Sequence, residues 1–126
     1  MSMNFTVNPG TQVLAVRCRN FKSKPWIIGS VSNGLVTGNR WKCFSLPREE
    51  QMNNRRWTKP NFDDSRWAQA VSNISSRKEE GPWLKVPDIS DEAFWISTAS
   101  EDHSRLFCRH RLSEVALKWV KSNGRY

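Results

Sequence analysis

Short apolar runs bounded by turn residues recur along this chain of 126 residues and constrain its fold more than any other feature. Alternating side-chain direction, with many β-branched and aromatic residues, is typical of half-buried strands. Runs of this kind cover residues 13–18, 26–31, 41–46, 94–98 and 106–112. Strands at this spacing, joined by irregular loops, predict an all-β, antiparallel β-sandwich that takes in residues 1–126 as a single domain.

Turn signals between the runs predict which of them pair. The sequence Ser-Asn-Gly at 32–34 ends the run at 26–31, so residues 35–37 are expected to pair back against that run. Residues 94–98 and 106–112 are expected to form a hairpin, because the segment between them is polar enough for an exposed tip.

The remaining segments are polar or ambiguous. Residues 47–56 and 72–81 are expected to be exposed loops, and residues 88–93 a single helical turn. Residues 113–120 fit either a short capped helix or a strand. Their β-branched and aromatic residues favour the strand.

The stretch from Trp57 to Ala70 has the most specific local pattern, because an Asp-Asp-Ser sequence separates Phe62 from Trp67. Asp and Ser side chains accept hydrogen bonds from backbone N–H groups one or two residues on, so residues 63–65 are expected to form a tight turn. That turn would hold both rings against a shared apolar layer. We interpret the two acids as turn acceptors, since nothing nearby supplies the further ligands of a calcium site or the partner base of a catalytic dyad.

The charge balance favours acidic partners. Twenty Lys and Arg residues against twelve Asp and Glu residues give a net charge of +8, which suits sulfated or sialylated glycans, anionic surfaces or nucleic acid. The basic residues are scattered, and no run of about five occurs that would indicate a nucleic-acid tail. No apolar stretch approaches the length of a membrane span, and no signal peptide is visible.

The three cysteines, Cys18, Cys43 and Cys108, allow one disulfide and leave one thiol over. No C-x-x-C spacing occurs, which argues against a zinc or thioredoxin-like site. His110 lies two residues after Cys108, but a metal site needs further converging ligands. The spacing is therefore interpreted as chance, and no metal site is predicted.

Several motifs taken together resemble one known family. The motifs "VLAVRCRN", "WIIGSVSNGLVT" and "WKC" are followed by "W…NFDDSRWAQA", "FWIST" and "LFCRHRL". This series covers nearly the whole chain and is similar to galactose-binding-like jelly-roll domains, above all the Trp- and Asp-rich versions found in extracellular invertebrate proteins and in large glycosidases. The order differs from the usual one, because "VLAVRCRN" comes first and "ALKWVKSNGRY" comes last, as in a circularly permuted or offset frame.

The resemblance implies a jelly-roll β-sandwich of about eight strands that serves as a non-catalytic binding module. Some relatives bind sugars through loops at one end of the sandwich, often with a structural calcium ion; apart from that ion, no cofactor is expected. The resemblance also implies a disulfide between Cys43 and Cys108 if the protein is extracellular, with Cys18 as a buried thiol. An extracellular location is expected on this ground, with a cytoplasmic one as the alternative.

The sequence predicts a binding site and no catalytic residue, because no G-x-S-x-G, H-E-x-x-H or glycine-rich phosphate loop occurs. A sugar site needs an aromatic face and polar side chains that fix the hydroxyl groups. The loop at 19–26 offers rings, an amide and cations together, and arginines near the expected hairpin tip suit a carboxylate or a sulfate. The predicted ligand-binding residues are Arg19, Asn20, Lys22, Trp26, Trp83, Arg105 and Arg109. Both tryptophans in this set also fit places in the core.

Three functions remain compatible with the sequence. The first, and the favoured one, is a lectin-like module that binds glycans or glycoproteins, including anionic ones. The second is a structural or protein–protein adhesion domain without a small-molecule ligand. The third is a nucleic-acid binder that uses the basic surface and exposed aromatic rings.

Overall fold

The computed structural model describes residues 6–7, 10–32, 34–75 and 89–112, and every strand pair in these ranges is antiparallel. The all-β prediction is therefore confirmed for the described part of the chain. Jelly-roll connectivity and a total of about eight strands stay predictions. The elements are β1 (Val13–Arg19), β2 (Lys42–Leu46), the 3₁₀ turn η1 (Arg56–Thr58), β3 (Ala68–Gln69), β4 (Val71–Ser75), β5 (Phe94–Ser97) and β6 (Arg105–Arg111).

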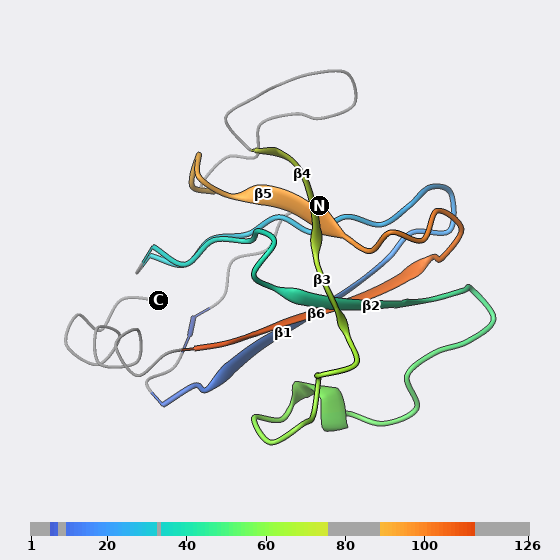
Figure 1. Ribbon diagram of the computed structural model, residues 1–126, viewed down its shortest axis with the longest axis horizontal. Coiled ribbons are helices and arrows are strands. Elements are labelled where there is room, and N and C mark those ends of the chain that lie inside the picture. The colour runs from blue at the N-terminus through green and yellow to red at the C-terminus, as the bar shows by residue number, and fades with distance from the viewer. Residues whose placement is uncertain (1–5, 8–9, 33, 76–88, 113–126) are drawn as a thin grey trace.

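The strands form two sheets (Figure 1). One sheet has four strands in the order β1-β6-β2-β3, and β4 pairs with β5 in a second sheet of two strands. Leu14 and Leu106 from the four-stranded sheet and Ile96 from β5 belong to one buried apolar cluster. Two antiparallel sheets that share an apolar interior are compatible with a β-sandwich.

The expected hairpin between residues 94–98 and 106–112 is wrong. Strand β6 lies between β1 and β2, whereas β5 pairs with β4. Ile96 and Leu106 are both fully buried in the same cluster, so β5 and β6 lie in different sheets on either side of the core (Figure 1). An alternating apolar run predicts a strand but not its partner, because the period of two residues is the same in every pairing.

The other strand predictions are confirmed in part. Strand β1 covers the alternating run at 13–18, and β2 covers most of the run at 41–46. Residues 26–31 form isolated bridges instead of a continuous strand, since Ser30 pairs with Val36 and Ile27 pairs with β5. The bridge from Ser30 to Val36 confirms that the chain turns back after residue 31.

The four-stranded sheet has two faces, because successive side chains of a strand point to opposite sides. Leu106 and Cys108 of β6 point to the second sheet, and Phe107 between them packs on the other side, which we call the outer face. The segment that connects β2 to β3 covers this outer face with Trp57 and Trp67, which cluster with Phe107.

The aromatic layer predicted from the Asp-Asp-Ser turn is present on the outer face. The ring of Trp67 packs edge-on against Phe62, with 5.6 Å between the ring centroids, and stacks on Phe44 at 5.4 Å. Residues 48–51 and 53–56 are exposed, as expected, whereas Met52 between them is half-buried and packs against this layer.

Candidate functional site

Arg109 is a fully buried charged side chain at the outer face. Its Nε donates to the carbonyl oxygen of Trp57 at 2.9 Å, and its Nη2 donates to that of Lys59 at 2.7 Å. Its Nη1 forms an ion pair with the carboxylate of Asp64, and the guanidinium carbon lies 5.3 Å from the centroid of the Phe62 ring. A buried charge is tolerated when it is paired and hydrogen-bonded, and here each guanidinium nitrogen has a partner.

Arg111 makes similar contacts two residues further along β6. It donates to the carbonyl oxygens of Pro60 at 2.6 Å and Phe62 at 2.8 Å. Backbone carbonyl groups outside a sheet need such partners, and the two arginines supply them along the connection from β2 to β3. We call Arg109, Arg111 and Asp64 the arginine clamp, because they fasten this connection to the sheet.

The structure does not support Arg109 as a ligand-binding residue at a hairpin tip. The residue lies in the interior of β6, and its donors are used within the protein. The sequence could not show this, because the counter-charge comes from Asp64, which is 45 residues away. The two neighbouring acids have different roles, although both were interpreted as turn acceptors. Asp63 forms the turn by accepting a hydrogen bond from the backbone N–H of Ser65 at 3.0 Å.

Three arginines surround a pocket at the other end of the outer face. Arg17 and Arg19 at the end of β1 and Arg105 at the start of β6 line a pocket of about 380 Å³. The connections after β1, after β2 and before β6 leave the sheet at this end, on the right in Figure 1. Arg17 and Arg19 are exposed, and Arg105 is half-buried. We call this the arginine pocket; its other lining residues are Cys18, Gln51, Met52 and Phe107.

The positive charge of the arginine pocket has no counter-ion within the described residues. The ion pairs among the described residues involve Lys24, Lys42 and Arg109, and none of them involves an arginine of the pocket. In addition, Arg19 and Arg105 are directly opposite each other in the register of β1 and β6. Like charges in directly opposed positions destabilise a strand pair, so this arrangement costs stability unless an anion is bound.

Phe21 orders one side of the arginine pocket. The guanidinium carbons of Arg48 and Arg105 lie over its ring, at 4.7 Å and 5.2 Å from the centroid. Arg105 also donates from Nε to the carbonyl oxygen of Arg48 at 3.2 Å. Cation–π contacts and a backbone hydrogen bond therefore hold the Arg105 side chain. Its terminal nitrogens, Nη1 and Nη2, have no protein partner in the part of the chain that the structure describes.

Asn20 shapes the loop that presents Phe21. Its Oδ1 accepts hydrogen bonds from the backbone N–H groups of Lys22 at 3.0 Å and Ser23 at 3.2 Å. This is a local turn of the kind that Asn favours. The side-chain amide of Asn20 also donates to the hydroxyl of Ser23. The structure therefore gives Asn20 a role in the loop backbone.

Apart from Asn20 and Arg109, the predicted ligand-binding residues divide into three groups. Arg19 and Arg105 come together in the arginine pocket. Lys22 is exposed and Trp26 is half-buried, with the Lys24 ammonium 4.9 Å from the Trp26 ring centroid, and neither Lys22 nor Trp26 lines the pocket. Trp83, together with the tail at 113–120, lies outside the described residues.

Sequence reasoning missed two features of this end of the sheet. Arg17 was not predicted, although its spacing of two from Arg19 puts both on one face of an extended strand. The second feature is a contact of 2.8 Å between Ser45 Oγ and His103 Nδ1, with Thr98 donating to Ser45 at 2.7 Å. A Ser–His contact alone does not form a nucleophilic site, which also needs a group that orients the imidazole and a place for substrate.

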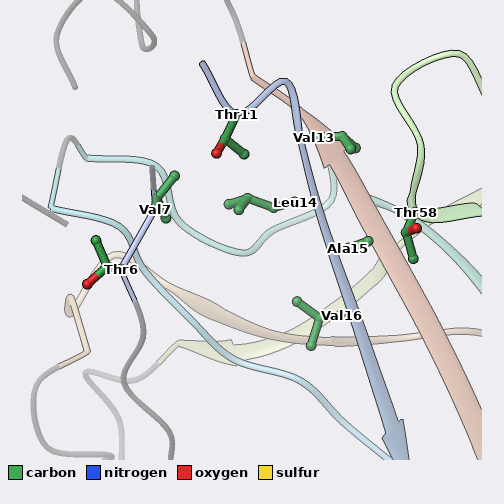
Figure 2. A pocket seen from close by; sticks show the side chains of 8 residues that line it. All are labelled: Thr6, Val7, Thr11, Val13, Leu14, Ala15, Val16 and Thr58. Carbon is green, nitrogen blue, oxygen red and sulfur yellow. The ribbon is translucent and has the colours of Figure 1, made fainter. Parts of the chain in front are cut away.

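A second hollow, of about 310 Å³, lies along β1 (Figure 2). Thr58 lies near Ala15 on one side of the strand, and Val7 lies near Leu14 on the other. No charged side chain lines this hollow. Its threonine hydroxyls are the only side-chain polar groups among its lining residues, so it offers little with which to orient a polar ligand.

Cys43 and Cys108 form a disulfide, which the resemblance implied. They are directly opposite each other on β2 and β6, and the bond closes a sequence separation of 65 residues. Cys18 is a free thiol and is half-buried. Burial raises the pKa of the Cys18 thiol above its ordinary value, which favours the protonated and less reactive form.

Two negative findings apply to the described ranges of the chain. They contain no cluster of three or more His, Cys, Asp or Glu side chains that could hold a metal ion. They therefore offer no carboxylate cluster for the structural calcium ion that the resemblance implies for some relatives. Nor do these ranges contain a helix with the length and apolar character needed to cross a bilayer.

Comparisons with family models, with curated proteins and with solved structures gave no match for this chain.

Proposed function

We propose that this protein is a non-catalytic, lectin-like module that binds acidic glycans through the arginine pocket. The observation that carries the proposal is the grouping of Arg17, Arg19 and Arg105 around one hollow, with no carboxylate paired to them in the described residues. Guanidinium groups bind carboxylate and sulfate oxygens in bidentate fashion. An anion would also relieve the repulsion between Arg19 and Arg105, which face each other across two strands.

The dimensions of the arginine pocket favour a short acidic saccharide. Its volume of about 380 Å³ lies at the lower end of the roughly 300–1,000 Å³ typical of small-molecule sites. The overall charge of +8 would attract such ligands over longer distances. The disulfide fits an extracellular location, where acidic glycans are accessible.

The same guanidinium groups favour nucleic acid or another polyanion as a second candidate, because phosphates are equally suitable partners. The two candidates differ in their dependence on salt. A ligand held by three arginines gives a slope of log affinity against log salt no steeper than about −3, whereas a polyanion that contacts more of the basic surface gives a steeper slope.

Isothermal titration of the protein with methyl β-D-glucuronide, methyl β-D-glucoside 6-sulfate and uncharged methyl β-D-glucoside tests the proposal. We expect saturable binding of an acidic sugar, no binding of the uncharged one, and a loss of about tenfold or more in the Arg17→Gln/Arg19→Gln variant. Arg55→Gln/Arg66→Gln removes the same charge from exposed residues elsewhere and should retain binding. Failure of every acidic sugar to bind would contradict the proposal and favour a structural domain.

A further inference from the structure

We infer that Arg105 determines which acidic group the arginine pocket accepts, and that this group is a planar carboxylate, as in a uronic or sialic acid. This inference rests on the proposed function, because it names the chemistry of the ligand for the same pocket. Arg105 differs from the other two arginines of the pocket in being half-buried and held by defined contacts.

The contacts of Arg105 leave one edge of its guanidinium group open. The Nε is used by the carbonyl oxygen of Arg48, at 3.2 Å, while Nη1 and Nη2 have no protein partner among the described residues. The two terminal nitrogens therefore present parallel N–H groups in one plane. This donor pattern matches the two oxygens of a carboxylate.

Phe21 makes this donor pattern rigid. Its ring contacts the guanidinium groups of Arg105 and Arg48 together, and the Asn20 turn holds the backbone that carries it. An arginine loses side-chain entropy when it is ordered by a ligand. Because Phe21 and Arg48 already order Arg105, less entropy is lost on binding. The ring is occupied by guanidinium groups, so its role is to position Arg105.

The arrangement distinguishes a carboxylate from a sulfate. One planar pair of N–H groups satisfies both oxygens of a carboxylate. A sulfate ester presents three terminal oxygens in a tetrahedral arrangement, so the same pair leaves one oxygen without a fixed donor. Arg17 and Arg19 are exposed and have no contacts in the described residues that order their guanidinium groups. They contribute positive charge to the pocket, whereas Arg105 contributes a pair of N–H donors in a fixed orientation.

The test compares methyl β-D-glucuronide with methyl β-D-glucoside 6-sulfate, titrated calorimetrically into wild type, Arg105→Lys, Phe21→Leu and the control Arg66→Lys. Arg105→Lys keeps the charge and removes the paired donors. It should weaken glucuronide binding about tenfold and sulfate binding less than about threefold. Phe21→Leu keeps Arg105 and should weaken glucuronide binding about threefold or more, while Arg66→Lys should bind as wild type does.

The outcomes separate this inference from the proposed function. If wild type binds neither acidic sugar, the proposed function fails and this inference fails with it. If wild type binds an acidic sugar but Arg105→Lys binds glucuronide equally well, or if the sulfate is the preferred ligand, only the present inference is overturned. Thermal unfolding of each variant checks that it is folded, and Phe21→Leu provides the test should Arg105→Lys not fold.

Discussion

The two ends of the outer face use the same residue type in different ways. At one end, Arg109 and Arg111 bind backbone carbonyl groups and Asp64. At the other end, Arg17, Arg19 and Arg105 surround a hollow and have no carboxylate partner in the described residues. Strand β6 contributes to both ends. Local burial and the presence of a counter-charge, and not the residue type, therefore decide whether an arginine holds the fold or is available to a ligand.

Removal of the counter-charge in the arginine clamp should have the largest effect on stability. Asp64→Ala leaves the guanidinium group of Arg109 buried without its anion, and breaking a buried pair in this way costs about 3–5 kcal/mol. Urea unfolding measures the change. Asp63→Ala is the matched control, because Asp63 is exposed and forms only a local turn. Equal losses of stability in the two variants would contradict the assignment of the clamp.

The disulfide links β6 to β2 on the side of the sheet that faces the second sheet, away from the clamp arginines. Cys43→Ala/Cys108→Ala removes a link across 65 residues and should lower the free energy of unfolding by about 2–5 kcal/mol. Cys18→Ala, the control, should have a much smaller effect, because Cys18 is outside the bridge. Mass spectrometry after alkylation of the denatured, unreduced protein should find one modified thiol; three would contradict the bridge.

Removal of a charge from the arginine pocket should raise stability, in contrast to the two changes above. Arg19→Gln removes one of two like charges that face each other across β1 and β6, so it should raise the free energy of unfolding by about 0.2–1 kcal/mol while weakening the binding of acidic sugars. Urea unfolding at low salt measures the first effect, and calorimetric titration the second. A loss of stability would show that Arg19 has a structural role like that of Arg109.

His110, between the two clamp arginines in sequence, should give the smallest effect. Burial, together with the nearby charge of Arg40, lowers the pKa of His110 below its ordinary value of 6.5. The unfolded chain then binds more protons than the folded one as the pH falls through 6.5, so this residue makes the protein less stable at lower pH. Between pH 8 and pH 5, the urea midpoint should fall less in His110→Gln than in wild type. The same fall of the midpoint in both proteins would contradict this expectation.

The sequence predicted several features that depend on local pattern, although residues 72–75 were expected to belong to an exposed loop and instead lie in β4. Alternation predicted the strand at residues 13–18, and the Asp-Asp-Ser motif predicted the turn at Asp63. Features that depend on long-range contacts were missed. The sequence predicted that β6 pairs with β5, whereas it pairs with β1 and β2. The two-residue alternation of a strand is the same whichever strand it pairs with. Arg109 was assigned to a binding site, because its carboxylate partner is remote in sequence.

The candidate site was predicted only in part, for the same reason. Arg19 and Arg105 were chosen for their charge and their position near loops, and they do meet in one pocket. The spacing of two between Arg17 and Arg19 could have indicated that both lie on one face of β1, but the contact of Phe21 with Arg105 does not follow from spacing, since it depends on the pairing of β1 with β6.

The central claim is that Arg105 contacts the ligand and Arg109 does not. Side-chain Nε–H resonances of arginine in ¹⁵N-labelled protein, followed during titration with methyl β-D-glucuronide, test it directly. The Arg105 resonance should shift in a saturable manner while that of Arg109 stays in place. A shift of Arg109, or an Arg105 resonance that does not move at saturating sugar, would contradict the account.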